Sequence, residues 1–281
     1  MPYKHAHYFV GFVLLVTLAG FWASYFTQIN GVPLAFHVHA FTATSWLLLV
    51  ILQSMSIHKG HAALHKLTGK ASFALFPLLI LGFVMIINVT AERFASQESP
   101  FIALLGPAFG TGMAIAIAAY LTLFYLALRH RRNIKLHAGY MLATPLILFE
   151  SPFSRIIDQF LPWMNFIGSE GPRQVLDAIA ISDMLVAAFA ITIYLRDRKN
   201  GAPWLVATFF VLMQAAVMWL APDIQFLRAF FEAYARLPQE LTMAFGLLAG
   251  AIVGYLGWTR GVSRGGKTAK GTGISASKAL P

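Results

Sequence analysis

Residues 73–90 read FALFPLLILGFVMIINVT, eighteen consecutive positions without a charged side chain. A helix that spans the hydrocarbon core of a bilayer needs about 20 predominantly apolar residues. We therefore expect this stretch to form most of a membrane-spanning helix at about residues 70–90. The same property recurs along most of the chain, so this segment decides how the remainder is interpreted.

Seven further segments have a similar length and apolar character. Of the 281 residues, 58% are hydrophobic and 11% are charged, whereas a soluble domain carries about 25% charged residues. The eight expected spans lie near residues 8–28, 34–56, 70–90, 101–128, 136–158, 174–195, 203–221 and 238–258. The sequence predicts an all-α fold, a polytopic membrane bundle of about eight transmembrane helices forming a single domain over residues 1–260.

The absence of cysteine limits the chemistry of the chain. Without cysteine there are no disulfides, thiolate metal sites, iron–sulfur clusters or cysteine nucleophiles. The P-loop, the G-x-G-x-x-G fingerprint, the nucleophile elbow and the H-E-x-x-H motif are also missing. Any reaction must therefore depend on histidine, carboxylates, arginine or a bound cofactor.

The basic residues are distributed unequally between the two sides of the predicted bundle. Sixteen of the twenty-one Lys and Arg residues fall in the N-terminus, in alternate connections and in the C-terminal segment. The other side holds Arg93, Arg155, Arg173, Arg228 and Arg236. Because Lys and Arg collect in cytoplasmic loops, both termini are expected in the cytoplasm. The net charge of +10 is thus an orientation signal, and we expect the lipid bilayer rather than nucleic acid as partner.

Three segments outside the central spans have distinct patterns. Lys4 followed by an apolar run resembles a signal peptide, but the run is long and the cleavage motif weak, so we expect a retained span. Residues 261–281 are expected to form a disordered, basic cytoplasmic tail. Between the last two spans, an amphipathic surface helix is predicted. Its apolar face is Leu227, Phe230, Phe231 and Tyr234, and its charged face is Arg228, Glu232 and Arg236.

Several ionisable residues occur within the outer half of the predicted bundle. At about 1.5 Å per residue, His39, Glu150 and Asp183 lie roughly 8–14 Å below the outer surface. They form one pocket if their three spans are neighbours, with Arg155 nearer the rim, and buried ionisable groups are functional candidates. The alternative is that Arg155 pairs with Asp158 and that Glu150 only links helices by hydrogen bonds.

The span that contains Glu150 also contains Pro145 and Pro152. Each proline removes a backbone donor and frees the carbonyl four residues earlier. We therefore expect a broken helix, and broken helices beside buried charges are typical of transporter binding sites.

Histidines gather on the cytoplasmic side. His61 and His65 are four residues apart, which on a helix presents both imidazoles to one metal ion, and His137 lies at the same level. These three residues are the candidate divalent metal site. A haem b held between His65 and His137 is a variant, with nearby basic residues neutralising its propionates. Alternatively, these histidines bind only lipid headgroups and loop carbonyls.

Two blocks of sequence resemble a widespread family of uncharacterised bacterial multi-span membrane proteins. The first block is His39-Ala40, Trp46, Gln53, His65 and Gly69, and the second is His137 followed by Met141-Leu142-Ala143-Thr144. The resemblance covers about forty residues and implies no reaction. It does imply that His39, His65 and His137 are the first candidates for cofactor binding, and that the chain lies in the bacterial inner (cytoplasmic) membrane. For Trp46 and Gln53 themselves, we favour a role in packing and hydrogen bonding between helices.

These features leave three functions open. We favour a metal- or haem-dependent redox protein or enzyme that acts on quinone or lipid through His65 and His137. The alternative is a proton- or ion-coupled transporter that uses Glu150 and Asp183. A non-catalytic assembly or sensor subunit is the third.

Overall fold

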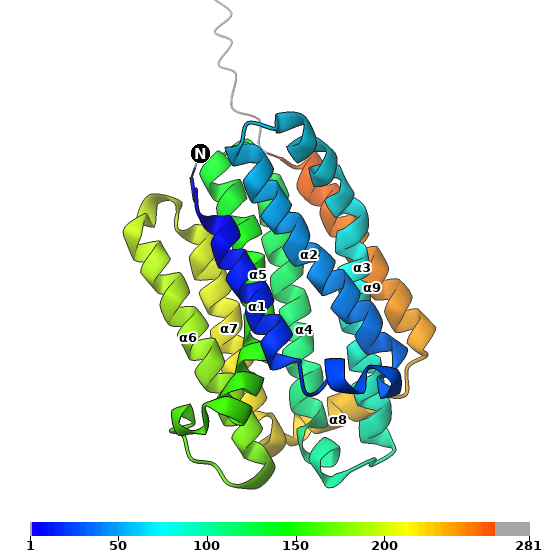
Figure 1. Cartoon of the computed structure of the whole chain (residues 1–281). Helices are drawn as coiled ribbons and strands as arrows, with labels where there is room; N and C mark the ends of the chain where they lie inside the picture. The colour runs from blue at the N-terminus through cyan, green and yellow to red at the C-terminus, as the bar shows by residue number, and fades with distance from the viewer. Residues whose placement is uncertain (1, 262–281) are drawn as a thin grey trace, which may run out of the picture.

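The computed structural model describes residues 2–261, and every regular element in this part of the chain is a helix (Figure 1). The α-helices are α1 (Ala6–Gly20), α2 (Leu34–His58), α3 (Ala62–Ala95), α4 (Pro100–Arg129), α5 (Ile134–Phe160), α6 (Gln174–Arg196), α7 (Ala202–Leu220), α8 (Gln225–Tyr234) and α9 (Gln239–Thr259). Short 3₁₀ helices occur in several connections. The predicted tail at residues 261–281 lies, apart from Gly261, outside the described residues.

All α-helices except α8 run alternately up and down the bundle (Figure 1). The N-terminus, the α2–α3, α4–α5 and α6–α7 connections and the last turn of α9 therefore share one end. We call this the basic end, because Lys59, Lys66, Arg131, Lys135 and Arg198 belong to it. The short helix α8 lies across the opposite end (Figure 1).

Six helices of the described chain are long and apolar enough to span a membrane, namely α2, α3, α4, α6, α7 and α9. The expected all-helical fold is confirmed for the described chain, and these six helices are compatible with a multi-pass membrane protein. The helix α1 is apolar but has only 15 residues. The helix α5 has 27 residues but carries Lys135, Glu150, Arg155 and Asp158.

The first predicted span, residues 8–28, is wrong at its carboxyl end. The helix α1 stops at Gly20, and a 3₁₀ helix (Phe26–Gly31) follows after a turn. Gly20 lies against the backbone of α5, where an added Cβ atom would be 2.1 Å from the Pro152 carbonyl oxygen. Hydropathy does not detect this ending, because residues 21–26 (FWASYF) are still mainly apolar or aromatic.

Aromatic rings from α2, α3 and α4 form the centre of the bundle. Phe76 and Phe124 stack with their ring centroids 4.0 Å apart, and Trp46 and Tyr120 pack around them. Both polar atoms of this cluster bond to Thr144 of α5. The Trp46 indole donates to the Thr144 hydroxyl at 2.8 Å, and the Tyr120 hydroxyl donates to the Thr144 carbonyl at 2.9 Å. The packing role expected for Trp46 is thereby confirmed.

The helix α5 is continuous through both of its prolines, so the predicted break is wrong. Pro145 leaves the Met141 carbonyl without its usual backbone donor. The Thr144 hydroxyl takes the place of that donor, at 2.8 Å from the Met141 oxygen. A hydroxyl group one residue before the proline thus satisfies the freed carbonyl inside the bundle, and the helix continues.

The predicted amphipathic helix is present as α8. Phe231 is only 3% exposed and packs against Phe94 of α3, while Phe230 is exposed. Arg228 and Glu232, one turn apart, form an ion pair of 3.4 Å on the charged face.

Replacing Thr144 by valine tests the role assigned to its hydroxyl. Thr144→Val keeps the side-chain shape but leaves the Met141 carbonyl and the Trp46 indole without their partners. We expect the free energy of unfolding to fall by about 1–2 kcal/mol, measured by thermal or denaturant unfolding in mild detergent. Thr192→Val is the matched control, because the exposed Thr192 hydroxyl bonds only within its own helix. Equal stabilities of the two variants would contradict this role.

Candidate functional site

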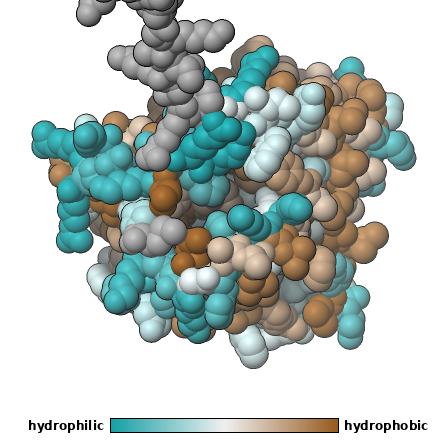
Figure 2. All heavy atoms as spheres, turned by 90° about the horizontal axis from the view of Figure 1, so that it is seen from above, coloured by the Kyte–Doolittle hydropathy of each residue, from teal (hydrophilic) through white to brown (hydrophobic). Residues whose placement is uncertain are grey.

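A cavity of about 890 Å³ opens at the basic end, between α2, α3, α4, α5 and α9. Its walls are mainly apolar and include Leu49, Val50, Phe73, Phe124 and Leu142. Figure 2 views this end of the bundle and shows hydrophilic side chains gathered over it with apolar ones between them. The volume lies in the range of about 300–1,000 Å³ that is typical of small-molecule sites.

Nitrogen-bearing side chains contribute much of the polar part of the cavity lining, beside several hydroxyl groups. They come from the ends of α2, α3, α4 and α5 and are His58, His65, Lys66, Lys70, Arg131 and His137, with Gln53. The lining contains no carboxylate side chain. An apolar body with an anionic end therefore matches the character of this cavity.

In both His65 and His137, the Nδ1 atom of the imidazole ring faces a backbone carbonyl. His65 Nδ1 bonds to the Gln53 carbonyl at 3.3 Å, and His137 Nδ1 bonds to the Ala127 carbonyl at 2.8 Å. Because a carbonyl only accepts, each Nδ1 carries the hydrogen, and the lone pair is on Nε2. Neither Nε2 atom has a hydrogen-bond partner in the described chain. A carbonyl behind the ring fixes its orientation in the manner usual for metal-ligating histidines.

His58 lines the same cavity, and each of its ring nitrogens lies within hydrogen-bonding distance of a backbone carbonyl oxygen. Its Nδ1 lies 2.7 Å from the Ser54 carbonyl, and its Nε2 lies 3.1 Å from the Pro2 carbonyl. Neither nitrogen is therefore available to a ligand, and Pro2 is held at the cavity wall.

Gln53 connects α2 to the start of α3. Its amide nitrogen donates to the His65 carbonyl at 3.0 Å and to the Thr68 hydroxyl. Gly69 lies beside it, and an added Cβ atom would be 3.7 Å from the Gln53 amide. Gln53 thus fixes the turn of α3 that carries His65, as its expected role in interhelical bonding required.

Positions that carry the sequence resemblance meet at this cavity. Gln53, His65, Gly69, His137 and Met141 all line it, although they come from three helices. His39 is the exception among the three histidines ranked first.

The three-histidine metal site is not assembled. The described residues contain no group of three His, Asp or Glu side chains that could hold a metal ion. His61 precedes α3 with non-helical backbone angles (φ −81°, ψ 63°), so the i, i+4 geometry of a helix does not apply to His61 and His65. His65 and His137 remain as a pair.

His39 does not join Glu150 and Asp183, so the pocket expected to contain all three is wrong. His39 packs between α2 and α3, with its ring centroid 4.5 Å from that of Phe83. An added Cβ atom on Gly82 would be 3.0 Å from His39 Cα. The tight contact between α2 and α3 turns this face of α2 away from α6.

Glu150 and Asp183 are brought together by the contact of α5 with α6, and Gln214 of α7 joins them. The Gln214 amide donates to Glu150 Oε2 at 3.0 Å, and the Ser154 hydroxyl lies 3.4 Å from Oε1. The Ser182 hydroxyl, beside Asp183, donates to the Glu150 backbone carbonyl at 3.2 Å. Sequence reasoning missed Gln214, whose only signal is a single amide in an apolar span.

Arg155 belongs to the opposite end of the bundle and does not pair with Asp158 within ion-pair distance in the described chain. Its guanidinium donates to the Ser151 carbonyl and hydroxyl, both at 2.8 Å. It also lies over the Phe21 ring, 4.7 Å from the centroid. The proposed rim ion pair is therefore replaced by a link between α5 and the turn after α1.

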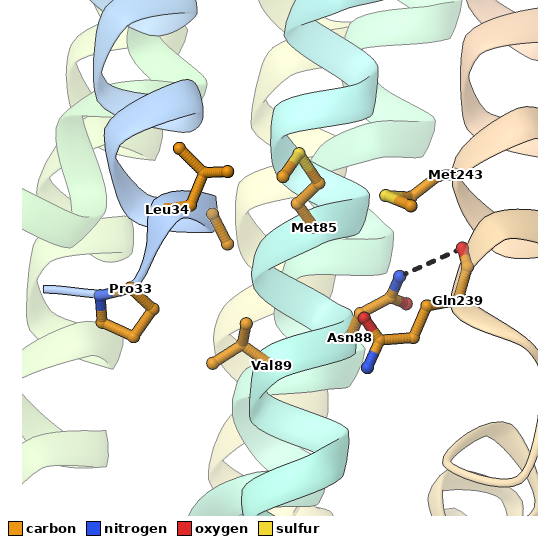
Figure 3. Close-up of a pocket in the computed structure, with 8 residues that line it drawn as sticks. Pro33, Leu34, Met85, Asn88, Val89, Gln239 and Met243 are labelled. Atoms are coloured by element: carbon orange, nitrogen blue, oxygen red, sulfur yellow. Dashed lines mark hydrogen bonds between the residues drawn. The ribbon is translucent and has the colours of Figure 1, made fainter.

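A second cavity, of about 210 Å³, lies between α2, α3 and α9 near the opposite end (Figure 3). Asn88 donates to the Gln239 carbonyl across it at 3.5 Å, and Met85 and Met243 complete the wall. None of its lining residues is ionisable. Its size and lining make it a packing gap rather than a site of chemistry.

Comparisons of the chain with family models, with curated proteins and with solved structures found no match. The resemblance noted from the sequence therefore stays a prediction.

Replacing Gln53 by leucine tests whether this residue fixes the site. Gln53→Leu removes the amide that bonds the His65 carbonyl and Thr68, and we expect the free energy of unfolding to fall by about 1–2 kcal/mol. Gln225→Leu, at an exposed position of α8, is the matched control and should change stability by less than about 0.5 kcal/mol. A Gln53 variant as stable as the control would show that the α2–α3 contact does not depend on this amide.

Proposed function

We propose that the chain is an eight-span protein of the bacterial inner membrane, with its basic end in the cytoplasm, and that its large cavity binds haem b. The proposal makes the protein a haem-dependent redox protein. One observation carries it: two histidines from different helices line one apolar cavity, each with Nδ1 bonded to a carbonyl and Nε2 without a partner.

The count of eight spans rests on charge and on chain direction. The helices α1 and α5 lie in the same bundle as the six long apolar helices and continue their up-and-down order along the chain (Figure 1). The excess of Lys and Arg at one end supports a cytoplasmic location for that end.

The histidine pair is of the residue type that would hold haem iron. Haem iron in proteins is commonly held by histidine, and a hydrogen bond from the other ring nitrogen orients the ligand. His65 and His137 also line the same cavity. His65 and His137 would hold the iron, and the carbonyls of Gln53 and Ala127 would keep both rings in the required tautomer.

The rest of the cavity fits the porphyrin. Phe73, Phe124 and Trp258 provide aromatic walls, and Lys66, Lys70 and Arg131 provide positive charge for the two propionates. Arg131 is held in place by its own contacts, since its guanidinium lies 4.5 Å from the Trp258 ring centroid and donates to the Leu128 carbonyl at 3.2 Å.

When bound, haem supplies one-electron transfer, and the chain's residues bind it, orient it and exclude water. A redox partner dissolved in the bilayer, such as a quinone, suits this position. The α9 wall of the cavity includes Tyr255 and Trp258, which are 67% and 51% exposed and face what would be lipid.

A second candidate is a lipid or quinone-like amphiphile bound without haem. The combination of apolar walls and a basic lining favours an anionic headgroup as well as a propionate. The two candidates differ in how they would use the Nε2 lone pairs, which would bind iron in haem but could only accept hydrogen bonds from a lipid or quinone-like amphiphile.

The test is haem content after substitution of the histidines. Wild-type protein from a haem-replete host should carry about one haem per chain, measured by absorption spectroscopy and a pyridine haemochrome assay. His65→Ala and His137→Ala should each lower affinity at least about 10-fold, and the double variant should carry none. His58→Ala is the matched control and should keep its haem, because a backbone carbonyl oxygen already lies against each His58 ring nitrogen.

Two results would contradict the haem proposal. One is a wild-type protein without haem or iron after purification in mild detergent without chelator. The other is a double variant that retains full haem content. Co-purified lipid or quinone in haem-free protein would support the second candidate instead.

A further inference from the structure

Two carboxylates of α6 are equally buried but have opposite surroundings. Asp177 and Asp183 are both 0% exposed. Asp177 accepts hydrogen bonds from the Ser169 amide and hydroxyl, both at 2.8 Å, and from the Trp219 indole at 2.9 Å. Asp183 accepts none, and both of its carboxylate oxygens are buried without a partner.

An ionised carboxylate without donors is costly to bury, and a group in that position becomes neutral or gains a partner. The helices packed on α6 provide little positive charge to stabilise an ionised Asp183. From α5 come Glu150 and Arg155, with Asp158 nearer the end of the bundle, whereas α7 carries no ionisable side chain. The turn before α6 holds Arg173, which forms an ion pair with Asp223. The turn after α6, at the basic end, holds Arg198 and Lys199. The helix α5 approaches Asp183 at Glu150, whose backbone carbonyl accepts a hydrogen bond from Ser182, the residue beside Asp183.

Glu150 has the surroundings of an ionised carboxylate. Gln214 and Ser154 donate to its two oxygens, and the positive charge of Arg155 acts on it. Ser182 fixes α6 beside it through the Glu150 carbonyl. The two carboxyl groups thus lie on adjacent, hydrogen-bonded helices. Glu150 has hydrogen-bond donors, and Asp183 has none.

We propose that Asp183 and Glu150 form a proton-binding site in the half of the bundle opposite the basic end, with one exchangeable proton carried by Asp183. With that proton bound, Asp183 is neutral and the charges of Glu150 and Arg155 cancel, so the buried group carries no net charge. Transfer of the proton moves it from an Asp183 carboxyl oxygen to a Glu150 oxygen, where the O–H bond broken is replaced by the O–H bond formed.

A proton suits this site better than a metal cation. Hard cations take several oxygen ligands, whereas the Glu150 oxygens already accept bonds from Gln214 and Ser154. The site is separate from the proposed haem cavity, and none of its residues lines that cavity. The proton-site proposal therefore does not depend on whether the cavity binds haem.

Infrared spectroscopy of the full chain in lipid vesicles tests the proposal. The wild type at neutral pH should show the C=O stretching band of a protonated carboxyl group, which shifts in D₂O. Asp183→Asn should lose this band entirely. Asp177→Asn, its buried neighbour on the same helix, should retain it, because the proton proposed here belongs to Asp183 and Asp177 already accepts hydrogen bonds from Ser169 and Trp219.

Glu150→Gln provides a second measurement if Asp183→Asn does not fold, as judged by circular dichroism. With the adjacent negative charge removed, the band should disappear at a pH at least about one unit lower than in the wild type. No band in the wild type, an unchanged band in Asp183→Asn, or an unchanged titration in Glu150→Gln would overturn the proposal. Loss of the wild-type band on adding Na⁺ at constant pH would also overturn it in favour of a cation site.

Discussion

The hydrogen bond from the Trp46 indole to the Thr144 hydroxyl joins α2 to α5 at the centre of the bundle, and both candidate sites depend on α5. The same hydroxyl satisfies the Met141 carbonyl that Pro145 leaves free. The helix therefore stays straight enough to carry His137 at one end and Glu150 toward the other. A kink at Pro145 would tilt the half of α5 that carries His137 relative to the half that carries Glu150.

The two sites occupy different depths of the same helix. His137 and Glu150 are thirteen residues apart, which corresponds to about 20 Å along the axis. This separation prevents direct contact between a ligand in the cavity and the carboxylate pair. Any influence of one site on the other has to pass through the packing of α5 against its neighbours. The aromatic cluster of Trp46, Phe76, Tyr120 and Phe124 lies between them and is closed to water.

Hydropathy and charge were sufficient to predict the helical bundle, because span length and loop charge are local properties of the sequence. The end of α1 at Gly20 was not predictable in this way, since it depends on the backbone of Pro152 from a distant segment. The break expected at Pro145 ignored the adjacent Thr144, whose hydroxyl reaches the free carbonyl. His65 and His137, paired from the sequence as cofactor ligands, both line the large cavity, and their role as ligands stays a prediction. His39 was grouped with the wrong helices because helix neighbours cannot be read from periodicity. Gln214 was missed because an uncharged amide gives little signal in an apolar span.

The shortness of α1 has a consequence for the surrounding lipid. Its fifteen residues extend about 22 Å, whereas the hydrocarbon core of a typical bilayer is about 30 Å thick. Trp22 and Phe26, exposed just beyond its end, are side chains of the kind that settle at the boundary between lipid and water. If α1 crosses the bilayer as proposed, the lipid beside it is under hydrophobic mismatch, which local thinning of the bilayer would relieve. Lipids with short acyl chains would gather along this one side of the protein, so the membrane around the bundle would be uneven in thickness and composition.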